Sequence, residues 1–406
     1  MLIPERFSTG PLTPCAYIRL LQPFDHLAAA TGLDIVLADA AEAKRYRPDV
    51  IVTQRHAVDS LAAADALHQH CREHDIALLY DLDDDLLDIP REHADADELR
   101  PRARIAEHML RAASAVWVST PRLKERLARM GVGAAVVPNA LDERLWADPP
   151  PIRPTRQGPV RILFMGTATH DADLALVEPA LARLHQAFPG RVRFEMIGVS
   201  TRRDLPEWVH RVPLAVSGNL SYPGFVNWTA QQPAWDIGIA PLADTPFNRG
   251  KSSIKAMDYA ALGLAVVASD IAAYADTLAD GVNGLLVANT GSAWFDALSR
   301  LVRDPALRLG LARGARAAFA ERWTLAAQAE PRQAAWREVV AAKPAQRQGT
   351  PDVQRGNGKR NGKAGNGEAA ATNMPVARTG ATSAPRGIRT PRPAQGHARA
   401  HATLAP

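Results

Sequence analysis

Two lysines spaced four residues apart offer the clearest chemistry in this sequence. Only five lysines occur between Met1 and Lys343, and Lys251 and Lys255 both fall at the start of a helix predicted over 252–262. Cations are unfavourable there, because a helix N-terminus carries about half a positive charge. An anion held between the free backbone N–H groups and the two ammonium groups would reverse this effect. The pair therefore predicts a cradle for a diphosphate.

The residues around the lysines fit the same chemistry. Gly250 allows a close backbone approach, and Ser252 and Ser253 supply hydroxyl donors and a helix cap. On a helix, Asp258 shares a face with both lysines, and a carboxylate in that place can accept from ribose hydroxyls. A surface ion pair between Lys255 and Asp258, worth about 0.2–0.5 kcal/mol, is the alternative. This ion pair does not explain why Lys251 lies at the start of the helix.

The elements that must position these residues alternate along the chain. Short apolar, β-branched runs alternate with helical patterns, which is typical of a parallel α/β fold. A proline-rich stretch at 147–159 interrupts the pattern and predicts a linker. The predicted strands are 33–38, 49–54, 76–81, 115–119, 134–138, 160–165, 191–198, 210–215, 235–242, 264–269 and 284–289. The predicted helices are 58–74, 98–113, 172–187, 252–262, 291–303 and 326–342.

This pattern predicts two Rossmann-like halves of similar size that face a central cleft. We expect a first domain at 1–150, a second domain at 151–343 and a tail at 344–406. Open α/β sheets bind ligands at the carboxyl ends of their strands, so a site between the halves is expected.

A second candidate contact lies in the turn after the first strand of the second half. Gly166 would let the backbone approach a ligand, Thr167 would contribute to binding that ligand, and His170 would line the cleft. The alternative is an ordinary strand-to-helix turn with Asp173 as an acid in the first helical turn.

Several motifs in one order resemble those of GT-B-fold glycosyltransferases. The chain is similar to glycosyltransferase family 4 of the bacterial polysaccharide-assembly type, over about residues 10–340. The motifs are LYDLDDDLLDIP (79–90), VVPNALDERLW (136–146), FMGTATHDADL (164–174), FNRGKSSIKAMDYAALG (247–263) and ADGVNGLLV (279–287). The resemblance implies two Rossmann-like domains and transfer of a sugar from a nucleotide diphosphate sugar. It makes 1–150 the acceptor-side domain and 151–343 the nucleotide-sugar-binding domain. It also favours retention at the anomeric carbon.

The resemblance also implies roles for single residues. Lys251, Ser252 and Lys255 would hold the phosphates, and Asp258 would hold the ribose. The two lysines would act in catalysis by stabilising the leaving diphosphate.

One position departs from the family. Of its two glutamates spaced by seven residues, the second is Asp258 here and the first is Gly250. The missing carboxylate normally touches the donor sugar, and Asn248 is a candidate substitute.

The first half contributes an acidic run and an arginine. Asp81, Asp83, Asp84 and Asp85 follow a predicted buried strand and resemble the metal-binding D-x-D of a GT-A glycosyltransferase. That interpretation leaves the paired lysines unexplained. The GT-B resemblance implies no essential metal, and no cofactor is expected. These acids would then line the cleft or cap the next helix, and Asp84 is the candidate for orienting the acceptor. Arg19 could meet acceptor or phosphate, or could be a surface arginine on an amphipathic helix.

Composition bounds the remaining possibilities. The 406 residues carry a net charge of +5, but the tail from 344 to 406 carries +8, so the body carries −3 and is not expected to bind nucleic acid. The tail has no aromatic residue and is expected to be disordered. Two cysteines argue against a disulfide scaffold, and no run of 18 apolar residues occurs. We expect a cytoplasmic protein, with peripheral contact to anionic membrane at the inner face through the tail.

Two hypotheses follow for function. The first is a hexosyltransferase type of glycosyltransferase that uses a nucleotide sugar and a glycan or lipid-linked acceptor. The second is a catalytically silent GT-B scaffold that binds nucleotide within a polysaccharide-assembly complex. Donor turnover separates them.

Overall fold

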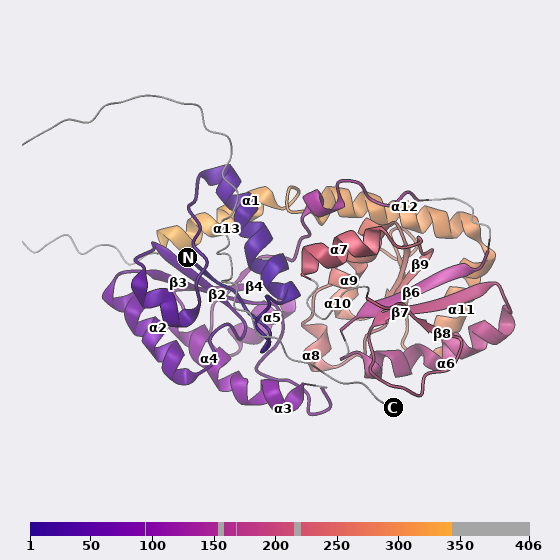
Figure 1. Ribbon diagram of the computed structural model, residues 1–406, viewed down its shortest axis with the longest axis horizontal. Helices are drawn as coiled ribbons and strands as arrows, with labels where there is room; N and C mark the ends of the chain where they lie inside the picture. Colours follow the sequence, from indigo (N-terminus) through magenta and orange to yellow (C-terminus); the bar gives the residue numbers. More distant parts are fainter. Residues whose placement is uncertain (94, 153–157, 168, 215–220, 343–406) are drawn as a thin grey trace, which may run out of the picture. The chain divides into compact units, whose positions relative to one another are not determined.

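The computed structural model describes residues 1–93, 95–152, 158–167, 169–214 and 221–342. Within these residues the chain forms two parallel β-sheets flanked by helices (Figure 1). The predicted disordered tail at 344–406 lies outside the described residues, as do part of the predicted linker and the last residue of the strand expected at 210–215.

The first sheet has five parallel strands in the order β1-β2-β3-β4-β5. Their bounds are β1 Leu2–Ile3, β2 Val50–Gln54, β3 Ala77–Leu82, β4 Ala115–Val118 and β5 Ala135–Val136. The strand predicted at 33–38 is wrong, since this stretch makes only a single bridge, from Leu37 to Leu2. Pairing stops there because Pro4, the next residue of the edge on that side, has no N–H to donate.

Two α-helices of the first half begin at polar caps. Ser60 accepts a hydrogen bond from the N–H of Ala63, and Thr120 accepts one from Leu123. The elements are η1 Ala16–Leu21, α1 Gln22–Thr31, η2 Ala40–Arg45, α2 Leu61–Glu73, α3 Ala96–Leu99, η3 Arg100–Arg102, α4 Ala103–Ala112, α5 Pro121–Ala128 and η4 Glu143–Trp146.

The second sheet has six parallel strands in the order β11-β10-β9-β6-β7-β8. Its strands are β6 Val160–Gly166, β7 Val192–Gly198, β8 Val209–Arg211, β9 Ile237–Ala240, β10 Ala265–Ser269 and β11 Leu285–Val287. The strand order reverses between β6 and β9, which is the topological switch point of a doubly wound fold. A ligand crevice is therefore expected at the carboxyl ends of these two strands.

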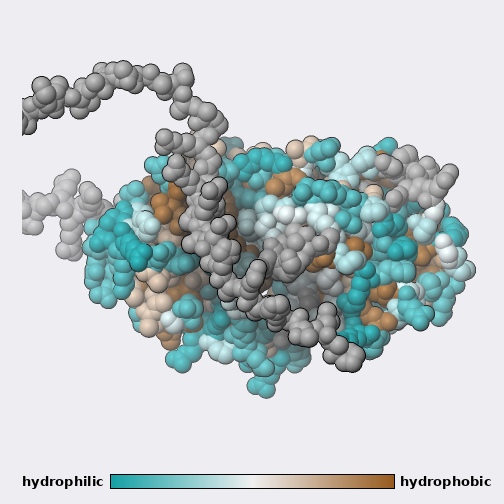
Figure 2. Space-filling model, in the orientation of Figure 1, coloured by the Kyte–Doolittle hydropathy of each residue, from teal (hydrophilic) through white to brown (hydrophobic). Residues whose placement is uncertain are grey.

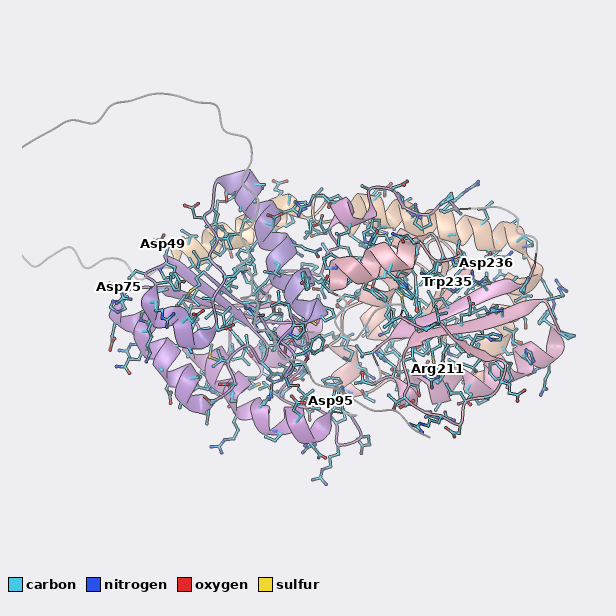
Figure 3. All side chains as sticks on the ribbon, viewed as in Figure 1. Asp49, Asp75, Asp95, Arg211, Trp235 and Asp236 are labelled. Carbon is cyan, nitrogen blue, oxygen red and sulfur yellow. The ribbon has the colours of Figure 1, made fainter. Side chains whose placement is uncertain are left out.

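The amino end of the β6–β9 pair is fixed by polar contacts beside the labelled residues Trp235 and Asp236 (Figure 3). The N–H of Arg161 donates to Asp236 at 2.9 Å, and the Arg161 guanidinium lies 5.4 Å from the centre of the Trp235 ring. The register of the strands at the switch point is thus held from the end opposite the expected crevice.

Helices of the second half cover both faces of its sheet (Figure 1). They are α6 Asp171–Ala187, α7 Tyr222–Ala230, α8 Pro246–Arg249, α9 Ile254–Leu262, α10 Ala272–Ala275, α11 Gly291–Arg303 and α12 Pro305–Arg322. The last helix is α13 Ala329–Ala341. Helix α13 packs against the first half, where the ring centres of Trp336 and Phe24 lie 5.3 Å apart and the two rings are nearly perpendicular. The sequence analysis placed a terminal helix here but did not identify α12.

Apolar side chains lie mainly in the interior. They form four buried clusters on the faces of the two sheets. The face shown in Figure 2 is correspondingly hydrophilic over most of its area, with small apolar patches. Among the described residues, none of the helices is both long and apolar enough to cross a bilayer.

Candidate functional site

The two predicted lysines lie at the switch point of the second sheet, but only one belongs to the helix. Helix α9 begins at Ile254, two residues later than predicted, so Lys251 lies in the short segment between α8 and α9. The helix cap predicted from Ser252 and Ser253 does not form at Ser253, the residue before the helix, because its side chain makes no capping bond. Ser253 is 2% exposed and its hydroxyl pairs with Thr277 at 2.7 Å.

Helix α9 is anchored to both strands of the switch point through Tyr259. The buried hydroxyl of Tyr259 accepts from the N–H of Met165 at 3.0 Å and donates to the carbonyl of Ile239 at 2.9 Å. Gly238 makes room, since a Cβ there would lie 2.7 Å from carbons of the Tyr259 ring. These contacts fix the start of α9, and with it Lys255, relative to β6 and β9.

Lys255 ends a chain of hydrogen bonds that crosses the switch point. Its Nζ lies 2.8 Å from His170 Nε2, and His170 Nδ1 lies 2.7 Å from Asp173. Asp173 also accepts from the backbone N–H of Ala243 at 2.8 Å. His170, predicted to line the cleft or to belong to an ordinary turn, therefore positions Lys255 together with Asp173.

Burial sets the charges in this chain. It lowers the pKa of Lys255 to about 8, with Lys251 adding to the effect. Burial and the Lys255 charge lower the pKa of His170 to about 4. At neutral pH a neutral imidazole therefore accepts from the Lys255 ammonium and donates from Nδ1 to the Asp173 carboxylate.

The turn after β6 contains the predicted Gly166 and Thr167. A Cβ at Gly166 would lie 2.7 Å from His170 Cδ2 and 3.2 Å from Lys255 Cε, so glycine leaves space for these two side chains. Gly198 has φ +64°, and a Cβ there would collide with the Gly166 carbonyl. The Thr167 side chain is exposed and its hydroxyl lies 2.8 Å from that of Thr169.

Asp258, the predicted ribose contact, is 7% exposed. The Tyr222 hydroxyl of α7 donates to its carboxylate at 2.9 Å. Burial raises the pKa of Asp258 to about 7, although the Tyr222 bond and Lys255 oppose the shift. Tyr222 lies 36 residues before Asp258 in the chain, so no local pattern pointed to it. Asn248, the suggested substitute for the missing glutamate, uses its amide to brace the carbonyl of Ala243 at 2.9 Å.

The first half holds the loop that carries Lys251. Thr120 donates to the carbonyl of Gly250 at 2.9 Å, and Asn139 donates to the Ser252 hydroxyl at 2.6 Å. Phe247 is buried in a core cluster of the first half. Sequence reasoning missed Thr120 and Asn139, because no local pattern connects residues more than a hundred positions apart.

Space at position 250 is limited by the first half. A Cβ there would lie 3.3 Å from Leu123 Cδ2, so a side chain at this position would require Leu123 to shift by a few tenths of an ångström.

The acidic run is paired with arginines throughout. Arg55 donates to Asp83 at 2.7 Å and to Asp84 at 2.9 Å, while Asp85 lies 3.3 Å from Arg126. Asp84 also lies 3.4 Å from Lys251 Nζ. Burial opposes ionisation of Asp84, but Lys251 and Arg55 hold its pKa well below the usual range. These guanidinium groups stand where a D-x-D site would place a divalent cation, so the run fits such a site poorly.

Arg19 occupies neither of the places expected for it. Its side chain is 1% exposed, and two of its nitrogens donate to the two carboxylate oxygens of Asp81, one of them at 2.9 Å. A third nitrogen donates to the carbonyl of Val137 at 2.7 Å and to Asn139 Oδ1 at 2.9 Å. The expectation of a surface arginine is wrong, and the guanidinium is already engaged within the protein.

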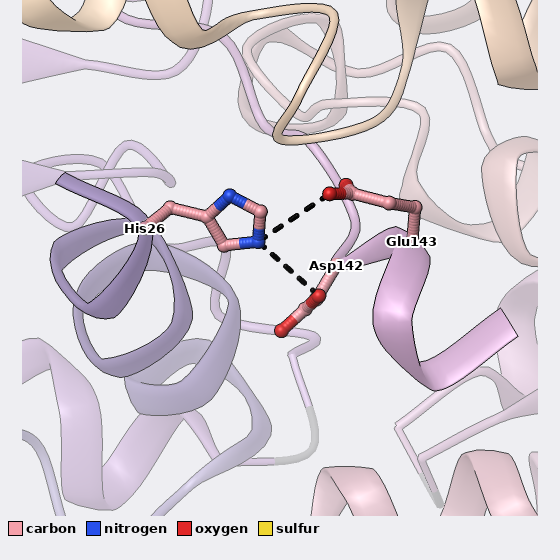
Figure 4. A group of neighbouring side chains, drawn as sticks. All are labelled: His26, Asp142 and Glu143. Carbon is pink, nitrogen blue, oxygen red and sulfur yellow. Dashed lines mark hydrogen bonds and ion pairs between the residues drawn. The ribbon is translucent and has the colours of Figure 1, made fainter. Parts of the chain in front are cut away.

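A second titratable cluster joins α1 to η4 (Figure 4). His26 Nε2 lies 3.3 Å from Asp142 and 3.5 Å from Glu143, and their potential ligand atoms are within 4.8 Å of one another. Arg144 already donates to both oxygens of Asp142, at 2.8 and 2.7 Å. We therefore assign the cluster as an ion-pair network rather than a metal site.

The first half also contains a cavity of about 910 Å³ at the carboxyl ends of β1 and β2. Its lining includes Glu5, Phe7, Arg55 and His56. His56 is 7% exposed, and among the described residues neither of its ring nitrogens has a hydrogen-bond partner. Burial lowers its pKa to about 3, so the imidazole is neutral. Side-chain contacts connect this cavity to the loop of Lys251. Arg55, which lines the cavity, also binds Asp84, and Asp84 lies 3.4 Å from Lys251 Nζ.

Comparison with known proteins supports this description of the second half. Residues 159–304 match the family model for Glycosyl transferases group 1. No curated protein matches the sequence significantly.

Solved structures match over both halves. Sucrose-phosphate synthase from Thermosynechococcus elongatus superposes with a TM-score of 0.54 at 16% identity, over 83% of this chain and 83% of that one. HepE from Anabaena, in complex with UDP and glucose, gives 0.52 at 17% identity over 75% and 80%. A glycosyltransferase from Rickettsia africae gives 0.52 at 15% identity over 74% and 79%. The fold is GT-B, as predicted, whereas membership of family 4 in particular stays a prediction.

Proposed function

We propose that the protein is a glycosyltransferase that moves a sugar from a nucleotide diphosphate sugar to an acceptor. The observation that carries this proposal is the placement of Lys251 and Lys255 at the switch point of the second sheet, within the segment that matches glycosyl transferases. HepE, which shares the fold, has been solved with UDP and glucose.

In this function the two lysines stabilise the charge that develops on the leaving diphosphate. Ser252 donates to a phosphate oxygen, Asp258 accepts from the ribose, and the turn at Gly166 and Thr167 lies beside the donor. Retention at the anomeric carbon and transfer of a hexose are further parts of the proposal that rest on the sequence resemblance.

The acceptor is proposed to enter from the first half. The cavity beside His56 has room for it, and the Arg55–Asp84–Lys251 contacts connect that cavity to the donor site. A glycan or lipid-linked acceptor fits a cavity whose lining combines charged, neutral polar and aromatic side chains.

A thermal-shift series tests the donor site. The protein is heated with UDP, GDP, ADP or TDP, beside Lys251→Ala and the exposed-lysine control Lys124→Ala. A ligand at 100 times its Kd adds about 2.7 kcal/mol of stability. One nucleotide is expected to stabilise the wild type and the control, but not Lys251→Ala. A wild type that responds to none of them would contradict the proposal.

A catalytically silent scaffold is the second candidate function. It is motivated by Gly250 in place of the glutamate and by Asp84, which already pairs with Lys251. Such a protein would bind the nucleotide sugar without releasing the sugar to water or to an acceptor. Donor turnover, followed by release of the nucleoside diphosphate, distinguishes the two candidates.

Affinity for the diphosphate is expected to fall as the pH rises through about 8. Lys255 must be protonated to attract phosphate, and its pKa of about 8 brings its loss of charge into this range. Calorimetric titrations between about pH 7 and pH 9.5 should show the Kd rising, whereas Lys255→Arg, whose guanidinium stays protonated, should flatten the profile. A flat wild-type profile would show that Lys255 does not titrate at the site.

A further inference from the structure

We infer that Asn139 of the first half is a positioning residue that directs the hydroxyl hydrogen of Ser252 toward the diphosphate of the donor. This inference rests on the proposed function. It concerns a chain of four side chains that runs from Asp81 through Arg19 and Asn139 to Ser252.

The first link fixes which end of the Asn139 amide faces Arg19. A guanidinium has only donors, so it can face an oxygen but not an N–H group. Arg19 donates to Asn139 Oδ1 at 2.9 Å and is itself held by Asp81, and the Arg19 and Asp81 side chains are 1% and 2% exposed. The amide of Asn139 therefore cannot be reversed without placing donors against donors.

The second link fixes the role of the Ser252 hydroxyl. With Oδ1 turned to Arg19, the Nδ2 group of Asn139 donates to Ser252 Oγ at 2.6 Å. A serine hydroxyl has one hydrogen and two lone pairs, and this bond uses a lone pair. The hydrogen remains to be donated elsewhere.

The surroundings of Ser252 define what can accept that hydrogen. The residue is only partly buried and follows Lys251 directly, at the loop proposed to receive phosphates. Phosphate oxygens are acceptors only, so a hydroxyl that is forced to donate suits them, whereas one that donates to the protein would not. The buried Asp81–Arg19 pair thus determines a property of the donor site without touching the ligand.

Asn139→Asp reverses the polarity of this chain with almost no change in shape. A carboxylate accepts from both Arg19 and Ser252, so the hydroxyl hydrogen turns away from the donor. We expect the Kd of the nucleoside diphosphate that stabilises the wild type to rise about tenfold or more, because a hydrogen bond to a charged group is lost. The affinity for the corresponding nucleoside, which lacks phosphates, should not change.

Two controls separate this role from simple docking of the halves. Thr120→Val removes another first-half hydrogen bond to the same loop but leaves the Ser252 hydroxyl polarised, so it should lower the melting temperature with little change in Kd. In a Ser252→Ala background, the effect of Asn139→Asp should shrink at least about threefold, leaving only repulsion by the added charge.

The outcomes are distinguishable. Equal weakening by Asn139→Asp and Thr120→Val, or an undiminished effect of Asn139→Asp in the Ser252→Ala background, would overturn the role of Asn139 while the proposed function stands. A wild type that binds none of UDP, GDP, ADP and TDP would overturn the proposed function and this inference with it.

Discussion

Replacing Lys255 with methionine is expected to abolish sugar transfer and, at the same time, to stabilise the unliganded protein. Loss of the ammonium removes a charge that acts on the leaving diphosphate, so kcat/KM should fall at least about a hundredfold. The stabilisation follows from burial, which lowers the pKa of Lys255 from 10.5 to about 8. The protonated form therefore opposes folding at neutral pH, by up to about 3 kcal/mol.

The pH dependence of the stability gives a second test of the charge on Lys255. Because the folded-state pKa lies below the ordinary value, the stability of the wild type should rise between pH 8 and pH 10.5, and that of Lys255→Met should not. Urea unfolding at several pH values measures both, with Lys124→Met as an exposed-lysine control. A variant that is less stable than the wild type at pH 7 would show that Lys255 contributes more through its contacts than it costs by its burial.

Arg19→Met is expected to destabilise the protein by about 3–5 kcal/mol, as measured by urea unfolding. It leaves the buried carboxylate of Asp81 without its cation, and breaking one side of a buried ion pair is strongly destabilising. Arg6, which pairs with Asp39 at the surface with 44% of its side chain exposed, is the matched control. Arg6→Met should change the stability by less than about 1 kcal/mol.

Removing the Asp81 carboxylate as well tests whether an unpaired charge causes the loss of stability. Arg19→Met combined with Asp81→Asn eliminates the unpaired charge, so part of the lost stability should return. If the double variant is as unstable as the sum of the single ones, the loss comes from packing and from the bonds to Val137 and Asn139 rather than from the isolated carboxylate.

Much of the fold could be predicted because each buried parallel strand has a pattern in its own sequence: a short apolar run between two helical patterns. All six strands of the second half overlap such runs: the run at 191–198 contains the whole of β7, and the run at 160–165 ends one residue before the end of β6. The stretch 33–38 has the same composition but no partner beyond one residue, since β1 is short and is followed by Pro4. Pairing depends on the neighbouring strand, which a single run does not reveal.

The residues of the candidate site could likewise be predicted only where they lie close together in the sequence. Lys251, Lys255 and Asp258 lie within one loop and helix, where their spacing is visible in the sequence. Thr120 and Asn139 reach that loop only through the contact between the halves. Arg19 was misplaced for a related reason, because its partner Asp81 lies 62 residues away and only the folded first half brings the two together.

The position of α13 has a consequence for the order in which the protein matures on the ribosome. Trp336 and Val339 pack in the same cluster as Leu2, Phe24 and Trp117. A nascent chain that has emerged only as far as the linker still exposes this apolar surface. The half that is translated first is therefore completed last, after the second half has been synthesised and α13 has returned to cover it.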